Sequence, residues 1–410
     1  MSSLERYDER LVQLAVKERQ RDIEPDIRLI AGEILNRVKR NQTSSPVRES
    51  GIANINDAKD PRKIWHVVPE RAEALEQGEI LPPVSIELQP TMTCNLRCQW
   101  CSYWDRNKFD EGKGEAIPFE YIQRLAQYCT DHNVKGIYLS GGGEPCAYPH
   151  IADTVRAFKD VGCQLAMITN GTMFAKTLLD QADAFTYLQV SLISPHREQY
   201  QSVTGRDKHH LMMNLPQNIK NRWGTKSPTI GGMYVLTQWN YKSARDAIDF
   251  ARTAGYDYCA FRTAIDFEDR GVSLPDEAFS WLREHFDEES PIDDTFTNLR
   301  SVLSRCRSTA EPVGKHCLST SLGLYATVNA RGEIYLCVPD VSKEGMAIGS
   351  MKDREFDEIW GGERHQDILK QLDERYACTQ CHPACRSHAY NRAIANEMPD
   401  QLPNTHVELV

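Results

Sequence analysis

The stretch that decides the fold reads Gln89-Pro-Thr-Met-Thr-Cys94-Asn-Leu-Arg-Cys98-Gln-Trp-Cys101-Ser-Tyr103, and it follows directly on an apolar run at 84–89. Short apolar runs of this length are typical of buried strands, so we expect the cysteines on the loop at a strand's carboxyl end. Three closely spaced thiolates can bind three irons of a cubane and leave the fourth iron open. The alternatives are a zinc site, which usually takes four ligands, or three unrelated buried cysteines.

The strand before these cysteines opens a repeating pattern in which short apolar runs alternate with amphipathic segments. This pattern predicts βα units and a parallel sheet. Strands are expected at 84–89, 136–140, 164–169, 187–192, 230–237 and 258–263, and helices at 118–132, 150–161, 176–181, 210–222 and 243–254. About six units are too few for a closed eight-stranded barrel. We therefore expect an α/β fold, a partial (β/α)6 barrel, with ligands at the carboxyl ends of its strands.

The regions on either side of the barrel differ from it in pattern. Residues 1–83 are expected to form a helical extension and linker, with a break at Pro25 and a short helix at 69–76, because proline disrupts a helix interior. The barrel is assigned to 84–305, with its last helical stretch at 275–305, and a small cysteine-rich domain to 306–410. In that domain, 323–329 and 333–337 flank a glycine turn and predict a β-hairpin, followed by a short helix at 355–360.

Composition limits the functional classes. The chain has 410 residues, of which 40% are hydrophobic and 26% charged, as in soluble globular proteins. A net charge of -10 argues against a general nucleic-acid binder. The sequence has neither a membrane-spanning apolar run nor a signal core, so we expect a cytoplasmic protein. Thirteen cysteines without a secretion signal favour metal ligation or catalysis over disulfides.

The Cys-x3-Cys-x2-Cys spacing, with aromatic Trp100 just before the last cysteine, resembles the radical S-adenosylmethionine (SAM) superfamily. The resemblance implies that Cys94, Cys98 and Cys101 hold a [4Fe–4S] cluster whose open iron binds the amino and carboxylate groups of SAM. One electron from the cluster then releases a 5′-deoxyadenosyl radical. An external one-electron reductant, such as flavodoxin or ferredoxin, is the implied partner.

Further motifs match the family's cofactor site. Ser140-Gly-Gly-Gly-Glu144-Pro145 ends the second expected strand, and glycines there let the backbone approach a ligand closely; a plain glycine turn is the alternative. By resemblance, this motif holds the amino group of SAM. The implied cofactor-binding residues are Gly142, Gly143, Glu144, Asn170, Ser191 and Arg206, with Trp100 and Tyr103 as stacking or shielding aromatics. Arg206 could equally be a solvated surface residue, and packing alone could explain the aromatics.

A second cysteine cluster lies in the C-terminal region. Its order, Cys317-x14-Gly332-x4-Cys337 and then Cys378-x2-Cys381-x3-Cys385, resembles the auxiliary-cluster extension called SPASM, or its shorter form called twitch. Full SPASM continues with more cysteines, so the resemblance implies one auxiliary [4Fe–4S] cluster on Cys317, Cys337, Cys378 and Cys381. Cys385 is either a substitute ligand or a free thiol. A structural zinc knuckle is the alternative.

These resemblances imply an enzyme that abstracts hydrogen from a polar small molecule, such as a natural-product intermediate. An auxiliary cluster that accepts an electron favours oxidation (dehydrogenation), and epimerisation is the related outcome; such a cluster can also serve only to tune a site or hold the fold. The alternative enzyme is a peptide maturase, and a third class is an interaction protein without turnover. Arg262 and Cys259 are weak catalytic candidates at the sixth expected strand.

Overall fold

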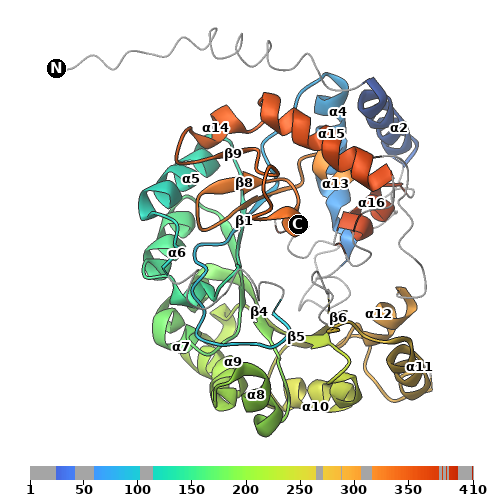
Figure 1. Ribbon diagram of the computed structural model, residues 1–410. Helices are drawn as coiled ribbons and strands as arrows, with labels where there is room; N and C mark the ends of the chain where they lie inside the picture. The colour runs from blue at the N-terminus through green and yellow to red at the C-terminus, as the bar shows by residue number, and fades with distance from the viewer. Residues whose placement is uncertain are drawn as a thin grey trace, which may run out of the picture.

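A nine-stranded sheet forms the centre of the molecule (Figure 1), with strand order β6-β5-β4-β3-β2-β1-β7-β8-β9. The computed structural model describes residues 25–41, 60–101, 114–264, 271–287, 289–305, 316–377, 381, 385, 387–395 and 409. The parallel strands are β1 (Ser85–Leu88), β2 (Gly136–Leu139), β3 (Gln164–Thr169), β4 (Phe185–Ser191), β5 (Thr229–Leu236) and β6 (Tyr258–Thr263). In the described part of the chain, β6 and β9 are the two edges of an open sheet, as expected for a partial barrel.

Helices follow the strands and cover the outer face of the curved sheet (Figure 1). They are α5 (Phe119–Asp131), α6 (Ile151–Asp160), α7 (Phe174–Thr177), α8 (Arg197–Thr204), α9 (His209–Trp223), α10 (Ala244–Ala254), α11 (Asp276–His285) and α12 (Leu299–Arg305). Helix α10 illustrates their origin, because its buried side chains recur every three or four residues and form one apolar stripe. It ends at Gly255, whose φ of 84° is a left-handed value that favours glycine.

The expected strands of the barrel agree with the observed ones to within two residues at each end. Two of the expected helical stretches are interrupted. The stretch expected at 275–305 forms two separate helices, α11 and α12, and the other interrupted stretch is the one expected at 176–181. There α7 stops at Thr177, and a 3₁₀ helix, Leu179–Ala184, follows it. Leu178 separates the two with φ -133°, which is far from α-helical geometry and breaks the run.

The C-terminal hairpin extends the main sheet. Its strands are β7 (Tyr325–Val328) and β8 (Glu333–Tyr335), which pair antiparallel, and β9 (Gly349–Ser350) follows. Gly332 makes the turn with φ 76°, which confirms the predicted hairpin. Strand β7 also pairs in parallel with β1 along all four residues, a contact that the sequence did not predict. The cysteine-rich region is therefore continuous with the barrel sheet.

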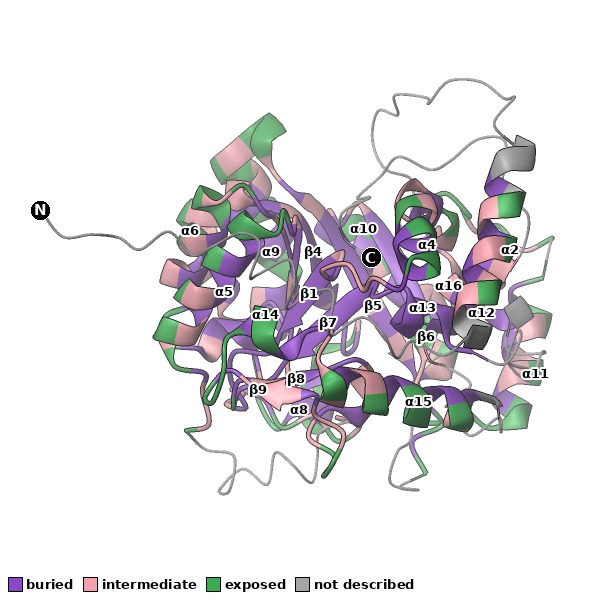
Figure 2. Cartoon of the chain, turned by 90° about the horizontal axis from the view of Figure 1, so that it is seen from above, coloured by how far each residue is buried: buried purple, intermediate pink, exposed green. Residues whose placement is uncertain are grey.

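The helical N-terminal extension packs on the C-terminal region. Its described elements are α2 (Pro25–Asn41), a 3₁₀ helix (Pro61–His66) and α4 (Val68–Glu76). They share an apolar cluster with α13 (Leu318–Ser321) and α16 (Ser387–Ala395), and the four α-helices lie together in Figures 1 and 2. The indole of Trp65 donates to the carbonyl of Ala393 (3.1 Å). Helix α2 starts at the expected proline, and the residues before it lie outside the described ranges.

Trp65 is 1% exposed in this cluster, so we expect Trp65→Ala to destabilise the protein by about 3–5 kcal/mol, the usual cost of truncating a buried aromatic. Thermal unfolding followed by circular dichroism measures this as a fall in Tm. Leu29→Ala is the matched control, because Leu29 is 68% exposed on α2 and surface changes usually stay within about 0.5 kcal/mol. Equal Tm values for the two variants would contradict the prediction.

Two further helices complete the C-terminal region: α14 (Phe356–Ile359), within the expected 355–360, and α15 (Glu363–Ala377), which was not predicted. Helix α15 carries three residues of the cysteine cavity described below. No helix within the described ranges combines the length and apolarity needed to cross a membrane.

Candidate functional site

The first three cysteines lie on the loop that follows β1, as predicted. Cys94, Cys98 and Cys101 are all half-buried. Burial raises the pKa of the Cys94 thiol to about 12, and it also raises the pKa of Cys98 well above its usual value, with the neighbouring thiols adding to both effects. Without a cation these thiols stay protonated, whereas bound iron would supply the positive charge that stabilises their thiolates. The donor set therefore fits an iron–sulfur cluster.

The cysteine loop is held by the end of α8. The backbone N–H of Arg97 donates to the carbonyl of Thr204 (3.0 Å), and that of Gln99 donates to the carbonyl of Val203 (3.1 Å). Backbone bonds of this kind fix a loop that has no regular structure of its own. The position of the cysteine loop is therefore fixed by contacts with a helix that lies about 100 residues later in the sequence.

Glu144 is the central acceptor of the glycine motif after β2. Its carboxylate is buried and accepts hydrogen bonds from Thr169 Oγ1 (2.5 Å), the N–H of Asn170 (2.8 Å) and the N–H of Cys146 (3.3 Å). Burial raises the pKa of this carboxyl, and the three donors partly offset that shift. These contacts join the end of β2 to the end of β3. The predicted contact of Glu144 with the SAM amino group stays a prediction.

Gly143 lies where the glycine motif meets the cysteine loop. A Cβ on Gly143 would lie 2.2 Å from the carbonyl oxygen of Thr93, a separation that no side chain tolerates. The N–H of Gly143 donates to the carbonyl of Thr91 (3.0 Å), and the N–H of Glu144 donates to that of Thr93 (2.9 Å). The backbone of Gly143 therefore packs directly against the segment just before Cys94, and only glycine leaves room for this contact.

Asn170 links the third strand end to the same loop. Its side-chain amide donates to Asn95 Oδ1 (2.9 Å), and its Oδ1 accepts from the N–H of Thr172 (2.9 Å). Asn95 in turn donates to Thr172 Oγ1 (2.8 Å). Asn170 is therefore positioned beside the cysteine loop, and its contact with a cofactor stays a prediction.

The remaining cofactor candidates are more dispersed. Ser191 is half-buried at the end of β4, and Arg206 is exposed after α8. Tyr103 lies outside the described residues. The ring of Trp100 stacks on that of Trp239, with centroids 6.5 Å apart and planes at 21°. Trp239 follows β5 and is 49% exposed, so two strand ends contribute aromatics beside the cysteines.

The two weak catalytic candidates lie differently on β6. Cys259 is fully buried and its Sγ lies 3.7 Å from the carbonyl oxygen of Ala247 on α10, in the outer helical layer. Burial raises the pKa of this thiol. This position is typical of a small packing residue. Arg262 is exposed near the carboxyl end of the strand, where substrate groups are expected.

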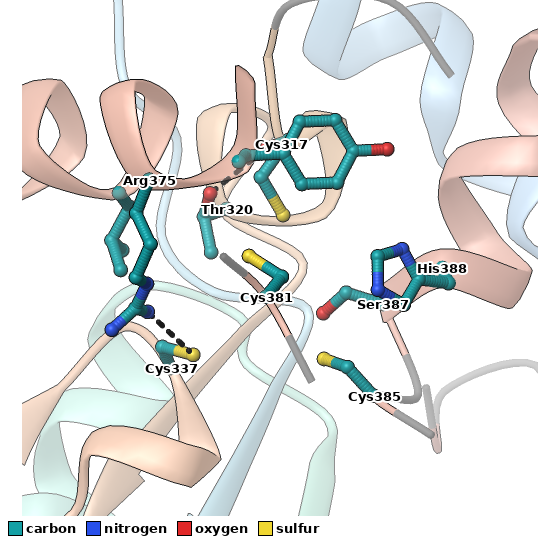
Figure 3. Close-up of a pocket in the computed structure, with 10 residues that line it drawn as sticks. Cys317, Thr320, Cys337, Arg375, Cys381, Cys385, Ser387 and His388 are labelled. Atoms are coloured by element: carbon teal, nitrogen blue, oxygen red, sulfur yellow. Dashed lines mark hydrogen bonds between the residues drawn. The ribbon is translucent and has the colours of Figure 1, made fainter. Parts of the chain in front are cut away.

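The C-terminal cysteines gather around one cavity, shown in Figure 3. Cys317, Cys337, Cys381 and Cys385 all line it, whereas Cys378 lies outside the described residues. The structure thus brings together three of the four predicted ligands and adds Cys385. Within the described residues, no three His, Cys, Asp or Glu side chains converge on a single metal ion. Four thiols around a cavity fit the donor set of a cubane.

Sequence reasoning missed two polar residues that contact thiols of this cavity. Arg375 Nη2 lies 3.6 Å from Cys337 Sγ, and Asn391 Nδ2 lies 3.5 Å from Cys317 Sγ. Both occupy helices, α15 and α16, that carried no motif and were not predicted. The sequence held one clue to Arg375, which lies three residues before Cys378, and no corresponding clue to Asn391.

Family models match both cysteine regions. The Radical SAM superfamily model matches residues 88–251, and the SPASM iron–sulfur cluster-binding domain model matches residues 317–386. The two matches coincide with the two sites described above. The chain belongs to the radical SAM superfamily, and its C-terminal region is a SPASM domain. It is accordingly a radical SAM enzyme. Its cofactors are SAM, a [4Fe–4S] cluster and auxiliary iron–sulfur clusters in the SPASM domain.

Particular relatives cover part of the chain. It is 27% identical over 176 residues to the tungsten-containing aldehyde ferredoxin oxidoreductase cofactor-modifying protein of Pyrococcus furiosus, covering 42% of this chain and 48% of that protein. It is 28% identical over 175 residues to a probable GTP 3′,8-cyclase of Thermococcus kodakarensis, covering 42% and 55%. The matches thus span about half the length of these relatives.

Solved structures share the fold over most of the chain. Streptococcus suis SuiB bound to its precursor peptide SuiA aligns with a TM-score of 0.57 and 14% identity, covering 91% of this chain and 86% of that one. Native anSMEcpe with bound AdoMet aligns with a TM-score of 0.52 and 15% identity, covering 75% and 94%. At these identities the likeness establishes the fold alone.

Proposed function

We propose that this enzyme abstracts a hydrogen atom from a C–H bond of a polar small molecule and yields an oxidised (dehydrogenated) or epimerised product. The observation that carries the proposal is the cavity lined by Cys317, Cys337, Cys381 and Cys385, because an electron acceptor there suits a net oxidation. When bound, SAM and the clusters supply the 5′-deoxyadenosyl radical and a one-electron acceptor. The protein's own residues hold these groups and orient the substrate.

The oxidation balances as a two-electron change at one carbon. For an alcohol, a hydrogen atom leaves the carbon and ends in 5′-deoxyadenosine. The carbon then gives up one electron, and the hydroxyl gives up its proton to a base or to water, so a carbonyl forms. Cys317, Cys337, Cys381 and Cys385 would hold the cluster that accepts this electron, and an external carrier of the flavodoxin or ferredoxin class would be its final acceptor. The exposed Arg262, at a strand's carboxyl end, is our candidate for holding an acidic substrate group.

Relatives support a small-molecule substrate. The named relatives include GTP 3′,8-cyclases and a dTDP-4-amino-4,6-dideoxy-D-glucose ammonia-lyase of Streptomyces venezuelae, which is 24% identical over 179 residues, covering 41% of this chain and 36% of that protein. These names describe a nucleotide and a nucleotide sugar. A polyhydroxylated or phosphorylated small molecule is therefore our first substrate class to test.

The test is deuterium transfer. The reconstituted, reduced enzyme is incubated with SAM and candidate amino sugars or nucleotide sugars carrying deuterium at each C–H position, and 5′-deoxyadenosine is analysed by mass spectrometry. We expect one labelled position to transfer deuterium. A product two mass units lighter than unlabelled substrate indicates oxidation, whereas an isomer that gains solvent deuterium indicates epimerisation. If the enzyme forms no 5′-deoxyadenosine at all, both this proposal and any other radical function fail.

A peptide maturase is the second candidate, and the fold likeness to SuiB bound to a precursor peptide favours it. Many such maturases bind a leader peptide with a winged-helix module. The described residues of the N-terminal extension, 25–41 and 60–83, form helices and irregular segments and contain no strand, which favours the small-molecule substrate. Transfer of deuterium from a labelled peptide, with none from the small molecules, would reverse this order.

The ligand set of the auxiliary cluster gives a separate prediction. In a chain that lacks Cys94, Cys98 and Cys101, we expect Cys385→Ala to lower the iron content from about four per chain toward three or fewer, because the variant leaves one iron of a four-cysteine cluster without a protein ligand. Iron analysis and electron paramagnetic resonance (EPR) measure this. Cys163→Ala serves as the control, since Cys163 lies outside both sites. Four retained irons would instead assign the fourth position to Cys378.

A further inference from the structure

A partly buried ion pair lies against one thiol of the C-terminal cavity. Asp340 is 1% exposed and accepts two hydrogen bonds from Arg375, through Nη1 (2.7 Å) and Nη2 (2.6 Å). Lys343 adds a further contact to the same carboxylate (2.9 Å). The same Nη2 of Arg375 lies 3.6 Å from Cys337 Sγ, as the dashed line in Figure 3 shows. The carboxylate therefore fixes the guanidinium in a position from which it donates to the sulfur.

A second donor faces a different thiol of the same cavity. Asn391 is fully buried on α16. Its Oδ1 accepts from both the N–H (2.9 Å) and the Oγ (2.8 Å) of Ser319. These two donors fix the orientation of the amide, so that its Nδ2 faces Cys317 Sγ at 3.5 Å. The contact is independent of the ion pair because it comes from another helix and reaches another cysteine.

Hydrogen bonds to cluster sulfurs change reduction potentials. A reduced cluster is more negative than an oxidised one, so N–H donors and nearby cations stabilise the reduced form and raise the potential. A buried carboxylate has the opposite effect. Here Asp340 also holds Arg375, the donor to Cys337. The ion pair therefore points an N–H at the sulfur while its two charges largely cancel.

We propose that Arg375, held by Asp340, and Asn391 are positioning residues that raise the reduction potential of the auxiliary cluster and so suit it to accept electrons. This inference rests on the auxiliary cluster of the proposed function but not on the substrate. Its test is therefore a redox titration, which needs no turnover. A wrong substrate class leaves the titration unaffected, and a failed titration leaves deuterium transfer unaffected.

The experiment uses the full chain with Cys94, Cys98 and Cys101 replaced by alanine, so that only the auxiliary cluster contributes to the EPR signal. At a fixed ambient potential, we expect Arg375→Met to lower the ratio of reduced to oxidised cluster at least about tenfold, equal to about 59 mV for a one-electron couple. Two changes cause this: the sulfur loses a donor, and the buried Asp340 carboxylate loses its main partner. Lys370→Met is the matched control, because it removes an exposed cation from the same helix.

Two further variants separate electrostatic tuning from a structural role. Asp340→Asn should raise the ratio, because it removes a negative charge while its remaining amide oxygen can still accept a hydrogen bond from Arg375. Asn391→Asp keeps an oxygen for Ser319 but replaces the donor to Cys317, so it should lower the ratio. A merely structural role would instead reduce the iron content of all three variants alike. If Arg375→Met does not retain its cluster, the opposite shifts of the other two variants decide the question. Shifts of one sign, or ratios within about twofold of the parent, would overturn the proposal.

Discussion

Replacement of Cys94, Cys98 and Cys101 together by alanine should abolish 5′-deoxyadenosine formation completely, while about four irons per chain remain. These half-buried thiols on the loop after β1 are the ligands that we propose for the cluster that delivers the electron to SAM. Without them, no electron reaches the sulfonium. Chromatography of reduced reaction mixtures measures the nucleoside, and colorimetric analysis measures the iron.

Cys163→Ala provides the control for this loss, because it removes a thiol outside both sites and should retain the parental iron and nucleoside formation. Nucleoside formation by the triple variant would contradict the assignment of the first site. Iron near zero with zinc retained would reject the auxiliary cluster and favour a zinc knuckle. The two results are independent, so each site is tested separately.

Gly143→Ala should reduce 5′-deoxyadenosine formation at least tenfold, because the new Cβ would lie 2.2 Å from the carbonyl oxygen of Thr93. That oxygen belongs to the backbone, so the whole segment before Cys94 must move. The movement also disturbs the hydrogen bond from the N–H of Glu144 to the same oxygen. Nucleoside formation and the iron content of the first site are the measurements.

Gly141→Ala is the matched control within the same motif. Its Cβ would meet the carbonyl oxygen of Gly143 at 3.3 Å, a contact that a shift of a few tenths of an ångström relieves. We expect activity within a fewfold of the parent. Equal losses in the two variants would mean that the motif as a whole, rather than the approach of Gly143 to the cysteine loop, limits activity.

The barrel strands were predictable because each short apolar run ends at residues typical of turns, so the run and its boundary indicate the same strand. At 164–169, for example, a short apolar run ends at Thr169-Asn170-Gly171, and the observed strand has the same bounds. The cysteine triplet was equally clear, because its spacing is local. Such features depend on residues that are adjacent in sequence, so the sequence alone is enough to predict them.

The missed features depend on partners far apart in sequence. The pairing of β7 with β1 joins Ser85 to Tyr325, and no local pattern encodes it. Arg375 gains its importance only from contacts with Cys337 and Asp340, on another segment. Gly143 was expected to approach a cofactor, whereas the structure shows that it also approaches the cysteine loop. Tertiary contacts decide each of these cases.

The pairing of β7 with β1 has a consequence for how separable the two domains are. A chain cut before Cys317 would lose β7 and leave one edge of β1 unpaired, and bare strand edges promote aggregation. The catalytic half is therefore unsuited to expression as an independent module. Exchange of the SPASM region between relatives would likewise require a replacement strand that matches the β1 register.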